Sequence, residues 1–180
     1  MTKKLIIILI LLISNLINAQ IKQNGNTLEI WTLFSPGNFV NQNAEQIVEK
    51  KWPFKIKGIA GDTFPENLID SLETHNNRIW NYLDANGYSN SKKKFETDLQ
   101  TEIKRIKKAV DISNSDKRVI AILDKLRKKG LQNYTELNKL CDVKYEFLLY
   151  SFNMNVLDKE QTFELKYIAD LEKEKIKIID

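Results

Sequence analysis

The sequence predicts an α+β fold dominated by helices, in which a small N-terminal β element precedes four to five amphipathic helices. Two short segments within residues 28–59 are rich in β-branched and aromatic residues, as strands usually are. From residue 65 onward, apolar side chains recur every three or four positions, which is the period of one helix face. Residues 28–180 have the length of one globular domain, so we expect a single, mostly helical domain there.

Residues 1–19 have the three-part pattern of a cleavable signal peptide. Lys3 and Lys4 form a positive start, an apolar run follows over residues 5–13, and Ala19 offers a small side chain at the cleavage point. The apolar stretch is shorter than the about 20 residues that a membrane-spanning helix needs, which disfavours an uncleaved anchor. No cysteine stands at the cleavage point. We therefore expect a secreted or periplasmic protein with no lipid anchor and no transmembrane segment after cleavage.

The mature chain is expected to begin with a polar, flexible leader over residues 20–27. Its composition narrows the classes of protein to which it can belong. Cys141 is the only cysteine, so no disulfide can form within the chain. We interpret Cys141 as a small buried hydrophobe, with a reactive thiol as the alternative. The net charge is +4 for the whole chain and +2 without Lys3 and Lys4, which is too small to indicate a nucleic-acid-binding protein.

The N-terminal β element is expected to be a βαβ unit. Residues 28–34 and residues 54–59 read as strands, and residues 41–51 between them are compatible with a short helix that ends before Pro53. Such a strand–helix–strand order favours parallel pairing of the two strands. Because two strands alone are marginal, a third strand is expected from the leader near residues 21–23 or from the tail at residues 175–178.

Two amphipathic helices follow the β element. The first begins near Pro65, which suits the first helical turn, and ends near Ala85, ahead of Gly87. The second begins near residues 89–91 and has a basic outer face. The apolar stripes of the two helices consist of Leu68, Leu72, Ile79 and Leu83 in the first and Phe95, Leu99, Ile103, Ile106 and Val110 in the second.

Three further helices complete the prediction. Ser115 is expected to cap a third helix that ends at Gly130, and residues 133–136 resemble a capping box that opens a fourth. Residues 158–161 are expected to cap a fifth helix. The inward-facing residues assigned to these helices are Val119, Leu123 and Leu126, then Leu137, Cys141, Leu148 and Phe152, then Phe163, Tyr167 and Leu171.

His75, the only histidine, is the first candidate for a catalytic residue. It projects with Asn76 onto the apolar side of its helix, where both polar side chains need hydrogen-bond partners. One hypothesis is a polar site in which His75 and Asp62 are catalytic and Asn76 and Thr63 bind a ligand, since ligands often bind at the carboxyl ends of strands. The alternative, which we favour, is a structural pair that fixes the helix on the sheet.

Motifs for other chemistries are missing from the sequence. One histidine and one distant cysteine do not supply the three or four ligands of a zinc site, and no EF-hand loop is present. Residues 58–63 only faintly resemble a phosphate-binding glycine turn. We therefore expect neither a metal nor a cofactor. The stretch over residues 75–80 (HNNRIW) is distinctive, but no activity can be attached to it.

The basic charge of the chain is concentrated in residues 92–129, which carry a net charge of +7. This segment is compatible with an ordinary solvated helix surface, or with binding to an envelope protein or an anionic surface. Asn133 begins a glycosylation sequon that a helix cap explains equally well.

These observations lead to ranked hypotheses about function. We expect an exported, non-enzymatic binding or scaffold protein that acts through helical surfaces. The alternatives are a small exported enzyme or ligand-binding protein centred on His75, Asn76 and Asp62, and an envelope-surface-associating protein that uses residues 92–129.

Overall fold

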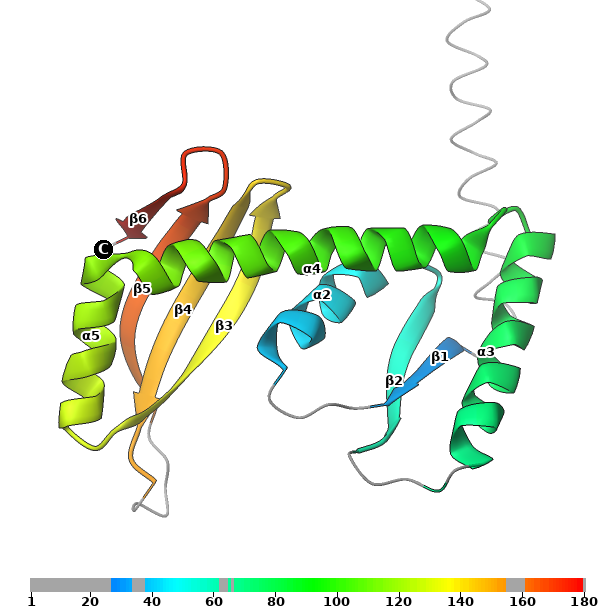
Figure 1. Cartoon of the computed structure of the whole chain (residues 1–180), viewed down its shortest axis with the longest axis horizontal. Helices are drawn as coiled ribbons and strands as arrows, with labels where there is room; N and C mark the ends of the chain where they lie inside the picture. Colours follow the sequence, from blue (N-terminus) through cyan, green and yellow to red (C-terminus); the bar gives the residue numbers. More distant parts are fainter. Residues whose placement is uncertain (1–26, 34–37, 62–64, 66, 155–160, 180) are drawn as a thin grey trace, which may run out of the picture. The chain divides into compact units, whose positions relative to one another are not determined.

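The computed structural model describes residues 27–33, 38–61, 65, 67–154 and 161–179. Within these ranges the chain forms four helices and six strands, which are shown in Figure 1. By its internal packing the chain divides into two units. Among the described residues, the first unit contains residues 27–33, 38 and those between 45 and 97, and the second contains residues 39–44, 98–154 and 161–179.

The first unit contains a parallel two-stranded sheet. Strands β1 (Leu28–Leu33) and β2 (Phe54–Ala60) pair in parallel, with Leu28 opposite Phe54, and helix α2 (Phe39–Glu49) lies between them in the sequence. All three elements lie close to where the sequence predicts them. The expected third strand is not added by the C-terminal tail, which pairs elsewhere, and residues 21–23 lie outside the described residues.

The outer edge of β2 donates a hydrogen bond to a side chain at the end of α2. Glu49 Oε2 accepts from the backbone N–H of Ile56 at 2.6 Å, and Glu49 Oε1 pairs with Lys55 Nζ at 2.8 Å. A side chain therefore supplies the acceptor that a neighbouring strand would otherwise supply to this N–H group.

Helix α3 (Asn67–Ala85) begins and ends within two residues of the predicted positions, and helix α4 (Ser91–Ser115) begins within the predicted residues 89–91. Gly87 has a φ of 95°, a left-handed conformation that glycine adopts without strain, and the N–H of Tyr88 bonds back to Leu83 O at 3.0 Å. This turn ends α3. Residues 91–97 of α4 belong to the first unit and residues 98–115 to the second.

An aromatic cluster forms the core of the first unit. Phe54 of β2, Trp80 of α3 and Phe95 of α4 have ring centroids 5.3–5.6 Å apart, and each side chain is at most 6% exposed. Trp52 adds a fourth ring beside Phe54 and Phe95. Edge-to-face and tilted ring pairs of this kind contribute about 0.5–1.5 kcal/mol each beyond their burial.

The second unit contains a four-stranded antiparallel sheet, and this overturns the prediction of a helix-dominated fold. Its strands lie side by side in sequence order, as Figure 1 shows. Residues 133–136 lie in a strand, so the capping-box interpretation was wrong, and residues 162–170, expected in a fifth helix, also form a strand. The strands are β3 (Gln132–Cys141), β4 (Lys144–Phe152), β5 (Thr162–Asp170) and β6 (Lys175–Ile179).

The alternation of buried side chains explains why this region is a sheet. In β4, Tyr145, Phe147 and Leu149 are at most 2% exposed, whereas the residues between them are partly exposed. Successive side chains of a strand point to opposite faces, so these three side chains share the buried face. In β5, Tyr167 continues this face with a ring stacked on Phe147 at 5.0 Å.

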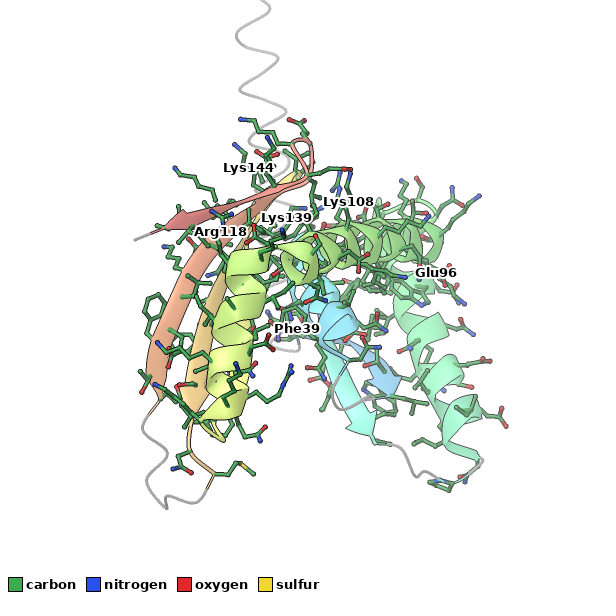
Figure 2. The ribbon with its side chains drawn as sticks, turned by 60° about the vertical axis from the view of Figure 1, so that its left-hand side comes forward. Phe39, Glu96, Lys108, Arg118, Lys139 and Lys144 are labelled. Carbon is green, nitrogen blue, oxygen red and sulfur yellow. The ribbon has the colours of Figure 1, made fainter. Side chains whose placement is uncertain are left out.

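Helices α4 and α5 (Lys117–Lys128) cover the buried face of this sheet. Ser113 Oγ of α4 and Tyr167 Oη share a buried hydrogen bond of 2.6 Å, and Figure 2 shows α5 in front of the strands. Asp116, rather than the expected Ser115, caps α5 by accepting from the N–H of Arg118 at 2.9 Å. No helix in the described ranges has both the length and the apolar character needed to cross a bilayer.

Candidate functional site

A cavity of about 330 Å³ lies within the first unit, between the end of β1, one face of α3 and the first turns of α4. This volume is at the lower end of the range that small-molecule sites occupy. Its lining consists of Ile30, Trp31 and Thr32 of β1, Leu72, Glu73, Asn76, Asn77 and Trp80 of α3, and Lys92, Phe95 and Glu96 of α4.

The two helices contribute residues at helical spacing. Leu72, Asn76 and Trp80 of α3 are four residues apart, and Lys92 and Glu96 of α4 are also separated by four. Side chains at this spacing lie one above another on a single helix face. The helical part of the cavity wall is therefore built from continuous helix faces, and β1 supplies the rest of the wall.

Asn76 fixes α3 against the free edge of β1. Its Oδ1 accepts from the backbone N–H of Trp31 at 2.8 Å, and its Nδ2 donates to the carbonyl oxygen of Trp31 at 2.8 Å. The amide thus satisfies both edge-facing backbone groups of this residue, as a neighbouring strand would. The same side chain forms part of the cavity wall.

His75 makes a second connection between α3 and β1. Its Nε2 lies 2.8 Å from the carbonyl oxygen of Glu29. A carbonyl oxygen can only accept, so Nε2 carries the proton in this hydrogen bond. The imidazole also stacks on the indole of Trp31, with ring centroids 3.7 Å apart and 7° between the planes.

The start of α4 is positioned by the end of α3. Asp84 Oδ1 accepts from the N–H of Ser91 at 2.8 Å, and the buried Ser91 hydroxyl donates to the carbonyl oxygen of Trp80 at 3.3 Å. The hydrogen bond from Ser91 lowers the pKa of Asp84 below its usual value. A carboxylate at a helix N-terminus is favourable because unpaired N–H groups converge there. These contacts orient Lys92 and Phe95 toward the cavity.

The cavity has apolar walls and a charged rim. Ile30, Trp80 and Phe95 are at most 6% exposed and form its buried part. Glu73, Lys92 and Glu96 are exposed, and Figure 2 labels Glu96 on the part of α4 that follows α3 in the sequence. An apolar interior with a few charged groups at the opening is typical of sites for small amphipathic molecules.

The indole N–H of Trp31 is a hydrogen-bond donor that lacks an acceptor. Among the described residues, it is the buried side-chain polar atom for which the structure gives no hydrogen-bond partner. Leaving such a group unpaired costs about 1–3 kcal/mol. Trp31 is also one of the residues that line the cavity.

A separate polar cluster lies in the second unit and has a structural role. The carboxylate of Glu102 is 1% exposed and accepts from Tyr145 Oη at 2.6 Å and from Lys139 Nζ at 2.7 Å (Figure 2 labels Lys139). Burial, followed by the bond to Glu102, raises the pKa of Tyr145. Burial opposes charge on Lys139, but its bonds to Glu102 and Asp142 outweigh it and raise the pKa of Lys139. These mutual bonds leave little capacity for a ligand.

The structure brings together two of the four predicted site residues. His75 and Asn76 both bind backbone atoms of β1, and Asn76 also lines the cavity. Asp62 and Thr63 lie outside the described residues. Sequence reasoning missed the contributions of Trp31 and Lys92, although the distinctive stretch over residues 75–80 contains three of the lining residues.

Cys141 departs from its expected environment. Cys141 is the last residue of β3 and is exposed there, so the interpretation as a buried hydrophobe was wrong. The helix that would have buried it does not form.

The basic segment 92–129 is partly neutralised by acidic residues outside it. Ion pairs join Arg105 to Asp142 at 3.1 Å and Lys108 to Glu174 at 2.7 Å. Each of these two pairs lowers the positive charge that the segment offers to an anionic surface.

The described residues contain no group of three or more His, Cys, Asp and Glu side chains that could hold a metal ion. Neither a protein-family model nor a curated protein nor a solved structure matches this chain, so the chemistry of the cavity is the basis for assigning a function.

Proposed function

We propose that this chain is a non-enzymatic binding protein that holds a small organic molecule in the cavity between β1, α3 and α4. The observation that carries the proposal is an apolar-walled cavity of about 330 Å³ lined by the aromatic residues Trp31, Trp80 and Phe95. A ligand in this cavity contacts aromatic rings, which favours the bound state.

The geometry around His75 favours binding over catalysis. A general base must reach the proton that it removes, and a nucleophile needs such a base within hydrogen-bond distance. The Nε2 atom of His75 is already bonded to the carbonyl oxygen of Glu29, and one face of its ring is covered by Trp31. His75 therefore supports the wall of the cavity instead of acting on a substrate.

The proposal includes a location: the protein functions outside the cytoplasm, after residues 1–19 have been removed. This part of the proposal rests on the positive start, the short apolar run and the small residue at Ala19. Mass spectrometry of the protein isolated from its native cells tests it. A mature chain that begins at Gln20 supports export, and a cytosolic chain that retains Met1 contradicts it.

Ligand binding is tested on the mature chain with a screen of amino acids, saccharides, nucleosides and short carboxylic acids. Thermal shift identifies binding, and titration calorimetry measures it. Leu72→Phe places extra volume in the cavity, and Leu68→Phe, one turn earlier on α3 and outside the lining, is the matched control. We expect at least one compound to bind, with affinity lost in the first variant and kept in the second.

Two results would overturn the proposal. One is that no compound in the screen binds at millimolar concentration, which corresponds to a binding free energy weaker than about −4 kcal/mol. The other is that Leu72→Phe and Leu68→Phe bind equally well, because the ligand would then occupy another place.

A further inference from the structure

The cavity rim carries both signs of charge, and this narrows the class of ligand. Lys92 and Glu96 lie one turn apart on α4, and Glu73 comes from α3. All three side chains are exposed, so they stay hydrated at little cost while a ligand is absent. The inference that follows rests on the proposed function, since it names the ligand of the same cavity.

Ligands of a single charge fit this rim poorly. A carboxylate without an amine pairs with Lys92 but faces two carboxylates, those of Glu73 and Glu96. An amine without a carboxylate pairs with these acids but faces Lys92. A neutral apolar molecule uses the walls and none of the charges.

A zwitterion uses both kinds of charge at once. Its carboxylate has the Lys92 ammonium as an available donor, and its ammonium has two available acceptors, Glu73 and Glu96. Hydrogen bonds between charged groups are shorter and stronger than neutral ones. The apolar walls at Trp80 and Phe95 require an apolar body between or beside these charges.

The cavity volume limits the size of that body. A volume of about 330 Å³ corresponds to the space of on the order of ten water molecules in the liquid. This matches a compact molecule with roughly that number of non-hydrogen atoms and excludes long acyl chains and dinucleotides. We propose that the ligand is a free apolar α-amino acid, of the size of leucine or phenylalanine.

Titration calorimetry on the mature protein tests this inference with a set of matched compounds. The probes are L-phenylalanine, L-leucine, phenethylamine, 3-phenylpropionate and 2-phenylethanol, which differ in the charged groups that they carry. We expect the two amino acids to bind about tenfold or more tightly than the other three, the effect of at least one hydrogen bond to a charged group.

Two pairs of variants locate the charge recognition. Lys92→Gln removes the proposed carboxylate partner, and Lys93→Gln, the adjacent exposed lysine outside the lining, is its control. We expect Lys92→Gln to abolish the preference for phenylalanine over phenethylamine and Lys93→Gln to keep it. Glu73→Gln should reduce the preference over 3-phenylpropionate, with Glu96 left as the second acceptor, whereas Asp70→Asn, also exposed on α3 and outside the lining, should not change it.

The failures of the two proposals are distinguishable. If phenethylamine, 3-phenylpropionate or another compound of the screen binds in the cavity as tightly as the amino acids, the ligand class is wrong while the binding function stands. Equal effects of Lys92→Gln and Lys93→Gln also contradict the ligand class. If no compound in either set binds, the proposed function fails together with the inference.

Discussion

The side-chain amide of Asn76 bonds both the N–H and the carbonyl oxygen of Trp31, each at 2.8 Å. One side chain therefore takes the position of a neighbouring strand along the edge of β1. The contact also fixes the position of α3 relative to the strand, and the cavity lies between these two elements.

Asn76→Ala is expected to lower the free energy of unfolding by about 2 kcal/mol, because two partly buried backbone groups lose their partner. Urea unfolding followed by circular dichroism measures the change. Asn77→Ala, at the exposed neighbouring position, should change stability by less than about 0.5 kcal/mol. Equal effects at the two positions would show that the amide does not hold the strand.

Glu102→Ala is expected to be more damaging, with a loss of about 3–5 kcal/mol, because it leaves the buried ends of Lys139 and Tyr145 without their shared acceptor. A double-mutant cycle between Glu102→Gln and Tyr145→Phe checks the contact itself. The two changes should be non-additive by more than about 0.5 kcal/mol in urea unfolding. Additive effects would contradict a direct interaction.

Asp84 is expected to make folding sensitive to acid. Since the Ser91 N–H lowers the pKa of Asp84 in the folded state, its stabilising contribution is present above the unfolded-state pKa and is lost as the pH falls through the lowered value. The free energy of unfolding of Asp84→Asn should therefore fall less steeply below about pH 4 than that of the unmodified protein. Asp70→Asn, on the exposed face of α3, is the control, and matching slopes for all three proteins would contradict the assignment.

The exposed thiol of Cys141 should react with a disulfide reagent such as DTNB in the native protein, without denaturant. We expect one thiol to react per chain while the protein is still folded, because Cys141 is exposed. Cys141→Ser gives the background. Protection of the thiol until the protein unfolds would contradict the exposed position.

Local sequence signals predicted the first unit and the helices well. Pro65 and Gly87 delimited α3, and the strand–helix–strand order gave the parallel pair β1 and β2. These signals succeed because they act within a few residues of the structure that they specify.

The strands of the second unit were predicted as helices because a short apolar pattern is compatible both with the helical period of 3.6 residues and with the strand period of two. Leu148 and Phe152 are four residues apart, as on a helix, yet in β4 both are partly exposed, and Tyr145, Phe147 and Leu149 form the buried face. A period of two was present in this run, but it does not by itself show which of the two faces other elements will cover.

The candidate site was only partly accessible from the sequence. The polar positions of His75 and Asn76 on an apolar face indicated a need for partners. Their partners are backbone atoms of Glu29 and Trp31, some 45 residues away, and no side-chain pattern identifies a backbone partner. The contribution of Lys92 depends on how the turn before α4 places the helix, which is a tertiary property.

The side-chain hydrogen bonds along β1 and β2 have a consequence for self-association. Exposed strand edges recruit further strands from other molecules, which is the first step of domain swapping and of fibril growth. Here Asn76 and His75 occupy backbone groups of β1, and Glu49 occupies the Ile56 N–H of β2. At these positions the backbone groups already have partners, so an incoming strand would have to displace side chains before it could pair there.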